Sequence, residues 1–284
     1  MPRVIPQTYF VPQPALWPIV AAAALLFMAS GGALWLNAGA RGPWILAAGG
    51  AILAVVLFGW FGTLIIEGRR GVYNDQVERS FRVGMAWFIF SEVVVFATLF
   101  AALFYTRLVS VPDLASGETE ALLWPGFKAG WPASGPGVEA TFSAMKALGI
   151  PALNTIMLLS SGAAVTLADR ALNRGQRGRL IALLAYTIVV GVLFLRNQAS
   201  EYHNAYTALH LTLASGAYGQ TFFILTGLHG FHVAIGTAFM TVMLGRSVRG
   251  DFTAKDHLAL QAATWYWHFV GIVWLILYVL VYWL

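Results

Sequence analysis

The sequence predicts an all-α membrane protein with seven transmembrane helices. Of its 284 residues, 59% are hydrophobic and only 10% are charged, whereas a soluble domain carries about 25% charged residues. The charges gather in short segments between apolar stretches, and each stretch approaches the ~20 residues that a helix needs to cross a bilayer core. Cysteine is absent, which excludes disulfides, thiolate metal sites and cysteine nucleophiles.

The seven spans form one membrane domain over 1–284. We expect them at 17–37, 42–66, 84–106, 151–168, 180–200, 219–244 and 261–284. The connection AGARGP between the first two spans is tight, which predicts an antiparallel hairpin. The longest connection, 107–150, is rich in Gly, Pro and Trp and is expected to be an ordered external loop. The proline-rich polar start of the chain does not have the pattern of a cleavable signal peptide.

The basic residues orient the chain in the membrane. Of the 17 Lys and Arg residues, twelve precede or connect the spans on one side. These are Arg3, Arg69, Arg70, Arg79, Arg82, Arg170, Arg174, Arg177, Arg179, Arg246, Arg249 and Lys255. The positive-inside rule then places the amino terminus in the cytoplasm and the carboxyl terminus outside. Because these cations lie in short loops, the net charge of +5 does not indicate nucleic-acid binding.

Glu92 is the sharpest polar feature within a predicted span. It lies about 12 Å along the third span at 1.5 Å per residue, where a charge costs about 2.5 kcal/mol or more. One interpretation is a neutral carboxyl that is hydrogen-bonded to Ser91 or to a histidine of a neighbouring helix. The other is a residue that handles protons or acts together with lipid. The sequence leaves both interpretations open.

Three histidines lie at membrane depth, His229 and His232 in LTGLHGFHV and His268 in TWYWHFVGIVW. Together with Glu92 they could supply a metal site, but no ExxH or HExxH ligand pair is present. We therefore expect no metal and consider His229 and His268 as residues that bridge helices.

Two further groups lie near the ends of the spans. Arg246 follows His232 by 14 residues, so the two side chains lie on nearly one helix face. They could hold an anionic phospholipid, although Arg246 could also be an ordinary cytoplasmic arginine. On the outer side, Glu201 and its aromatic neighbours in QASEYHNAY are expected to form an interfacial belt. Arg196 is explained by snorkelling to the outer surface.

The motifs together resemble those of subunit III of cytochrome c oxidase, in the haem–copper oxidase superfamily. The resemblance covers nearly the whole chain in the order of that family. The matching stretches are WPIVAAAALLFMASGGALW, FRVGMAWFIFSEVVVF, LNTIMLLSSGAAVT, QASEY, YGQTFFILTGLHGFHVAIG and ATWYWHFVGIVWLILYVLVYW. SEV, GxHGxHV and WYWHFV are highly specific in combination, and seven spans suit this family better than the five-span quinol oxidase form.

The resemblance implies a non-catalytic subunit of a proton-pumping respiratory oxidase. It implies a two-helix bundle and a five-helix bundle, separated by a V-shaped cleft that is filled with phospholipid. It also implies packing on subunit I, an association with subunit II, and support of proton uptake and sustained turnover. The haem and copper of this family lie in partner subunits, so neither a redox centre nor a catalytic residue is expected on this chain.

The resemblance also assigns individual residues. Glu92 matches the buried carboxylate of this family that reacts with carbodiimides. The lipid site is implied for Phe61, Glu67, His232 and Arg246. The sequence departs from the pattern of the family at Phe61, where Trp is frequent, and at Gly271, where Asp is common.

Three alternatives remain to the main interpretation. They are a related subunit of a quinol oxidase, a redox subunit that binds metal through its histidines, and a proton-coupled transporter built around Glu92. The paired broken helices typical of transporters are not evident. We expect a bacterial cytoplasmic membrane from the Arg- and Ala-rich loops, with a mitochondrial inner membrane as the alternative.

Overall fold

The computed structural model describes residues 15–138, 141–253 and 257–283. Within these ranges seven helices are long and apolar enough to cross a membrane, and no strand is present. The fold class predicted from the sequence is therefore confirmed. Arg3 and Lys255, which were used for the orientation, lie outside the described residues, as do Leu284 and the start of the proline-rich leader.

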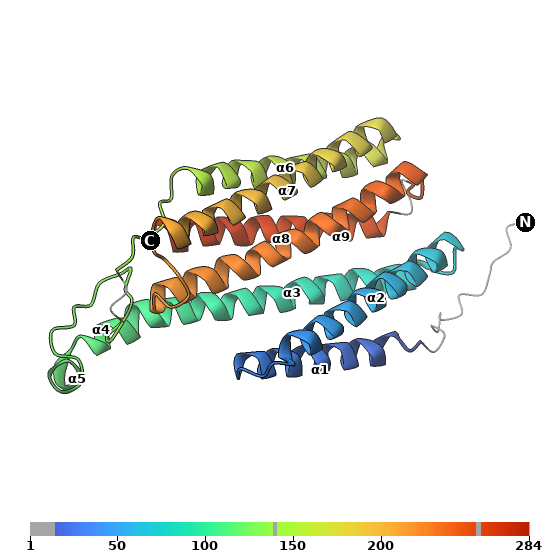
Figure 1. Cartoon of the computed structure of the whole chain (residues 1–284). Helices are drawn as coiled ribbons and strands as arrows, with labels where there is room; N and C mark the ends of the chain where they lie inside the picture. The colour runs from blue at the N-terminus through green and yellow to red at the C-terminus, as the bar shows by residue number, and fades with distance from the viewer. Residues whose placement is uncertain (1–14, 139–140, 254–256, 284) are drawn as a thin grey trace, which may run out of the picture. The chain divides into compact units, whose positions relative to one another are not determined.

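The spanning helices follow the predicted order along the chain (Figure 1). Their bounds are Trp17–Leu36 for α1, Gly42–Arg69 for α2, Asp75–Tyr105 for α3, Ile150–Asn173 for α6, Arg177–Thr207 for α7, Ala217–Arg249 for α8 and Leu258–Leu277 for α9. A π-helical segment η2, Tyr278–Trp283, continues α9. Another, η1, Thr106–Ser110, joins α3 to the short helix α4, Val111–Leu114.

The third helix is much longer than its apolar run. It begins at Asp75 rather than near 84, because Asn74 Oδ1 accepts a hydrogen bond from the Val77 amide at 3.0 Å. Asp75 and Glu78 in the first turn complement the positive end of the helix dipole. The hydropathy pattern marks only the part of a helix that lies in lipid, so this polar start was not predicted.

The chain divides into two compact units, with the boundary between Val83 and Gly84. In the first unit, α1 and α2 pack as the expected hairpin through small residues. A Cβ at Gly31 would lie 2.8 Å from Leu46 Cα, and one at Gly49 would lie 2.8 Å from the Met28 amide nitrogen. Such close backbone approach is typical of helix pairs in lipid, where dispersion drives association.

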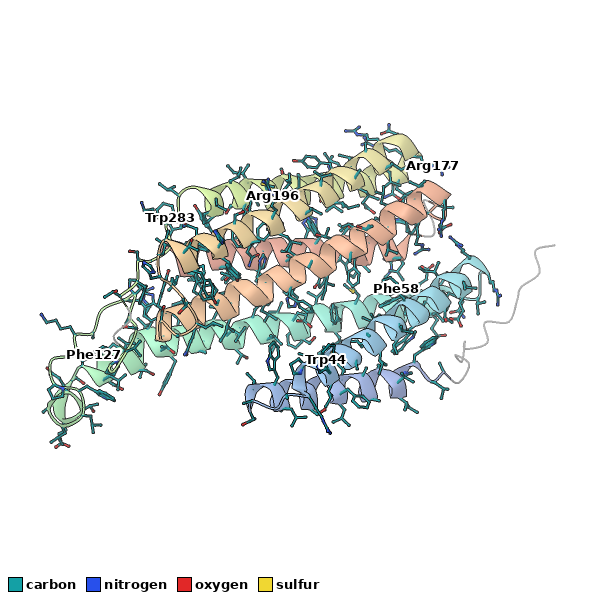
Figure 2. The ribbon with its side chains drawn as sticks, in the orientation of Figure 1. Trp44, Phe58, Phe127, Arg177, Arg196 and Trp283 are labelled. Carbon is teal, nitrogen blue, oxygen red and sulfur yellow. The ribbon has the colours of Figure 1, made fainter. Side chains whose placement is uncertain are left out.

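Most other side chains of this hairpin face outward. Trp44 is 78% exposed and Phe58 is 79% exposed, and both point away from α2 in Figure 2. Large exposed aromatic and aliphatic side chains are the expected lipid-facing surface of a spanning helix.

The second unit holds α3 from Gly84 onward and the four helices α6 to α9, and its core is aromatic. Trp267 and Trp274 of α9 are 1% exposed. Their indole N–H groups donate to Ser161 Oγ at 3.0 Å and to Thr155 Oγ1 at 2.9 Å, both on α6. Within a membrane no water is available to satisfy these donors, so the two bonds hold α9 against α6.

The expected external loop begins later than predicted, because the helical course extends to Leu114. The loop contains one short helix, α5, Gly117–Leu122. It closes on the start of α8, where the Ala217 and Tyr218 amides donate to loop carbonyls at 3.0 Å. The Phe142 ring stacks on the Tyr218 ring, with centroids 5.6 Å apart. These contacts satisfy the free amides at the start of α8.

Candidate functional site

The partly buried Glu92 of α3 and the buried His232 of α8 form a pair inside the second unit. Glu92 Oε2 lies 3.0 Å from His232 Nε2, and the two side chains are 20% and 8% exposed. Ser91, the other candidate partner, instead donates to the Phe88 carbonyl of its own helix at 2.7 Å. The partner of the carboxyl is therefore a histidine of another helix.

The second ring nitrogen of His232 determines how many protons this pair holds. His232 Nδ1 lies 2.7 Å from the Leu228 carbonyl oxygen, which can only accept, so Nδ1 carries a hydrogen. With a neutral ring, Nε2 is then an acceptor and Glu92 must donate a carboxyl proton to it. With a charged ring, Nε2–H donates to the carboxylate. Both states share one proton across the 3.0 Å contact and have no net charge.

Aromatic rings enclose this pair. The Phe96 ring of α3 meets the His232 ring edge-on with centroids 5.1 Å apart, and the rings of Tyr266 and Phe269 from α9 lie 6.4 and 6.3 Å away. An apolar enclosure strengthens the interaction between proton donor and acceptor and penalises a net charge. These surroundings therefore favour a pair without net charge.

His229 and His268 make separate contacts between helices. His229 is fully buried, and its Nε2 lies 3.1 Å from the Val270 carbonyl of α9, to which it donates. His268 Nε2 lies 3.0 Å from Thr166 Oγ1 of α6. That hydroxyl donates to the Gly162 carbonyl, so His268 is the donor in the contact. Over the described ranges, no three His, Cys, Asp or Glu side chains come together as a metal site.

Phe61 and Glu67, the lipid candidates of the first unit, lie on α2. Phe61 is 50% exposed. Glu67 Oε2 accepts a hydrogen bond from the Tyr73 hydroxyl at 2.7 Å. Burial, followed by this bond and the charge of Glu67, raises the pKa of Tyr73, which keeps the phenol protonated as a donor.

In the second unit, Arg246 Nε lies 3.5 Å from Asp251 Oδ2, and the guanidinium lies over the Phe252 ring at 4.5 Å. His232 is paired with Glu92 as described. Both lipid candidates on α8 therefore have protein partners, and Arg246 remains partly accessible with 16% of its side chain exposed.

The polar residues near the carboxyl-terminal end of α7 were interpreted incompletely from the sequence. Gln198 Nε2 donates to the Thr226 carbonyl of α8 at 2.6 Å, and the Tyr202 hydroxyl lies 2.7 Å from Thr226 Oγ1. The Asn197 amide donates to Asn154 Oδ1 of α6 at 2.9 Å. These bonds tie α7 to both neighbours, and the signal for them was the polar run after an apolar helix.

Three further positions that were singled out in the sequence can now be placed in the structure. Glu201 is only 2% exposed, so its assignment to an interfacial belt was wrong. Arg196 is exposed on α7 (Figure 2), and the structure gives it no other explanation. A Cβ at Gly271 would meet no atom within 4 Å, so the Asp that is common in the resembled family would fit there.

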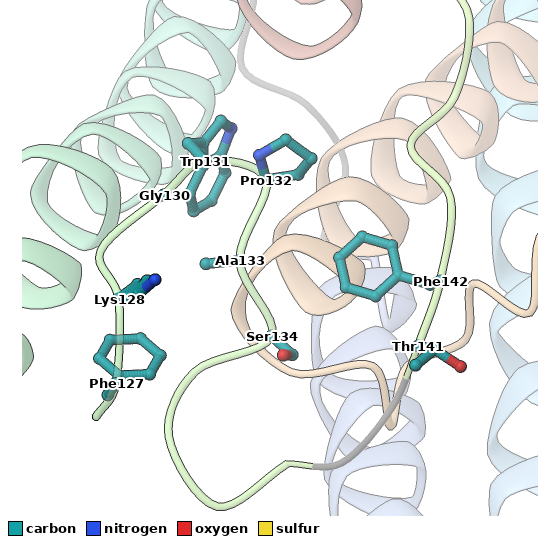
Figure 3. A pocket seen from close by; sticks show the side chains of 9 residues that line it. All are labelled: Phe127, Lys128, Gly130, Trp131, Pro132, Ala133, Ser134, Thr141 and Phe142. Atoms are coloured by element: carbon teal, nitrogen blue, oxygen red, sulfur yellow. The ribbon is translucent and has the colours of Figure 1, made fainter. Parts of the chain in front are cut away.

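The external loop also forms an open cavity of about 510 Å³ (Figure 3). Its walls are the aromatic rings of Phe127, Trp131 and Phe142, with Lys128 and Thr141 at the edge. Among its described lining residues the cavity has no carboxylate and no histidine.

Comparisons with known proteins confirm the resemblance. The family model described as cytochrome c oxidase subunit III matches residues 7–284. Proteins named cytochrome c oxidase subunit 3 from Formosania lacustris and Oryctolagus cuniculus are 37% identical to the chain over 276 residues. The one from Scyliorhinus canicula is 38% identical over the same length. In each case the match covers 97% of this chain and 96% of the relative.

Proposed function

The chain belongs to the cytochrome c oxidase subunit III family, and on that premise we propose that it supports proton uptake and sustained turnover without catalysing the reaction itself. As a member of this family it is an integral membrane protein and part of a cytochrome c oxidase complex. Its proposed partners are subunit I, as the main contact, and subunit II. Haem and copper are assigned to those subunits.

The Glu92–His232 pair is the observation that carries this proposal. A carboxyl and an imidazole, which are both groups that can bind a proton, lie 3.0 Å apart on two spanning helices. The contact itself does not require a carboxyl rather than an amide at position 92. In the neutral state the carboxyl donates to Nε2. A glutamine amide at position 92 can donate to the same nitrogen, so the hydrogen bond is retained and only the transferable proton is lost.

Glu92→Gln in the assembled oxidase therefore separates a proton role from a packing role. We expect unchanged haem spectra, altered labelling by a hydrophobic carbodiimide, and faster loss of activity during turnover. Ser91→Ala is the matched control, because the Ser91 hydroxyl bonds only within its own helix. Labelling and a turnover lifetime equal to those of the unmodified complex would show that the pair serves packing alone.

The absence of a redox centre from this chain is tested by metal content. We propose that haem and copper co-purify with the tagged chain in mild detergent and are lost when the partner subunits are stripped. The donor geometry supports this, because His229, His232 and His268 each contact a different protein group. Metal that remains on the isolated chain would instead favour a redox subunit with its own site.

We also propose that the chain binds anionic phospholipid, with Phe61 and Glu67 contributing on α2 and His232 and Arg246 on α8. The exposed ring of Phe61 and the partly accessible guanidinium of Arg246 support this. Arg246→Ala is expected to lower the anionic phospholipid that co-purifies with the complex. Arg249→Ala, one turn later and exposed, is the control. Equal lipid content in both variants would exclude Arg246 as a lipid ligand.

The proposed architecture is a two-helix bundle and a five-helix bundle. The boundary between Val83 and Gly84 supports it, because it leaves two spans in the first unit and five in the second. We propose a bacterial cytoplasmic membrane with the amino terminus inside, although the relatives named above come from animals. Fractionation of the source cells, together with protease access to a tag at each terminus, tests both statements.

A further inference from the structure

Glu201 is a second buried carboxyl for which the proposed function gives no role. It lies near the carboxyl-terminal end of α7 and is 2% exposed. Neither carboxyl oxygen accepts a hydrogen bond from any of the described residues. One turn earlier on α7, Gln198 Oε1 is likewise buried without a partner. Unpartnered buried oxygens are rare in proteins because each loses its hydration without compensation.

Phenols, rather than cations, surround this carboxyl. The groups that interact electrostatically with Glu201 are Tyr282 of η2, Tyr218 at the start of α8 and the adjacent Tyr202. The Tyr282 hydroxyl faces the carboxyl as a donor, although no hydrogen bond of normal geometry forms between them. Within the described residues Glu201 forms no ion pair, and Arg196 lies on the exposed side of α7.

An ionised carboxylate is poorly stabilised in this environment, because among the described residues Glu201 forms no ion pair and only phenol hydroxyls face it. Burying a charge without a counterion or donors costs several kcal/mol. A protonated carboxyl has no charge, and its carbonyl oxygen can still accept from the Tyr282 hydroxyl. The neutral form therefore fits this cluster at a lower cost than the charged form.

We infer that Glu201 is a proton-binding site of this chain, a neutral carboxylic acid that faces the Tyr282 hydroxyl. It is separate from the Glu92–His232 pair. Tyr218, which flanks Glu201, precedes His232 by 14 residues on α8, or about 21 Å at the helical rise. The inference does not depend on the oxidase role, because it follows from the burial and partners of Glu201 alone.

Infrared spectroscopy of the purified complex near neutral pH tests this directly. A protonated carboxyl has a carbonyl stretch that a carboxylate and an amide lack. We expect one such band to disappear in Glu201→Gln and to remain in Glu118→Gln, because Glu118 is an exposed carboxyl outside this cluster. The band must also shift in D2O, since a proton-binding site exchanges its proton.

Tyr282→Phe provides a second measurement that keeps the carboxyl in place. It removes the hydroxyl donor that faces the Glu201 carbonyl oxygen, so the same band should move to higher frequency without being lost. A spectrum that Glu201→Gln leaves unchanged would show that Glu201 is ionised and would overturn the inference. A band that Tyr282→Phe does not move would overturn Tyr282 as the neighbour of the carboxyl. A band that never shifts in D2O would overturn Glu201 as a site that exchanges its proton.

Discussion

Gly31 and Gly32 are adjacent in α1, and replacing each with alanine should change stability in opposite directions. A Cβ at Gly31 would lie 2.8 Å from Leu46 Cα on α2, whereas a Cβ at Gly32 would meet nothing within 4 Å. Ordinary van der Waals contact begins at 3.4 Å, and the Leu46 amide nitrogen lies even closer than the Cα, so Gly31→Ala forces the two backbones apart by more than about 0.6 Å. A gap of this size loses a quarter or more of the dispersion attraction between facing atoms.

The expected magnitudes follow from these contacts. Overpacking a close interface costs about 1–3 kcal/mol, and replacing glycine within a helix returns about 0.5–1 kcal/mol. Gly31→Ala should therefore lower the free energy of unfolding by about 1–2 kcal/mol, because the strain exceeds the gain. Gly32→Ala has no strain to offset, so it should raise the free energy of unfolding by up to about 1 kcal/mol.

The assay is the folded fraction of the protein against SDS mole fraction in mixed micelles. Gly49 and Gly50 on α2 repeat the comparison from the other side of the interface. A Cβ at Gly49 would lie 2.8 Å from the Met28 amide nitrogen, and one at Gly50 would meet nothing within 4 Å. If the alanine variants at 31 and 32 shift stability in the same direction, close backbone approach does not hold this hairpin together.

Three further changes test the polar contacts of the fold. Trp267→Phe should cost about 1–3 kcal/mol in the same unfolding assay, because the α6 hydroxyl loses its indole donor, whereas the half-exposed Trp265→Phe should stay within about 0.5 kcal/mol. Arg177→Ala should cost about 1–2 kcal/mol, because Arg177 donates to two of the last carbonyls of α8, and the exposed Arg179→Ala should cost little. Because the pKa of Tyr73 is raised in the folded protein, its protonated phenol contributes to stability in full below pH 10, the usual pKa of the group. This contribution is lost as the pH rises through the pKa of the folded state. Tyr73→Phe should therefore reduce the loss of stability that is measured above pH 10.

The exact helix ends and the partners of buried side chains could not be predicted from the sequence. The apolar runs located every span, but the polar first turns of α3 depend on capping by Asn74, which hydropathy does not register. Glu92 stood out because a carboxyl is rare among apolar residues. Its partner remained open between Ser91 and a histidine, because that choice depends on how α3 and α8 pack.

Glu201 is the clearest failure of the sequence interpretation. In the sequence it stands in a polar, aromatic run beyond an apolar helix, a pattern that is typical of a membrane interface. In the fold, the carboxyl-terminal segment returns across the end of α7 and brings the Tyr282 hydroxyl against it. These residues are far apart along the chain, so no local pattern could have predicted the burial.

The sequence by itself determined the number and order of the spanning helices, because a bilayer requires each span to be a long apolar helix whose own backbone is satisfied. It also determined the family, through motifs that together cover the chain. The tertiary structure alone decided which nitrogen of His232 faces Glu92, which histidines bridge helices, and which carboxyl is buried without a partner. Those outcomes depend on contacts between helices, and such contacts arise only when side chains distant in the sequence pack together.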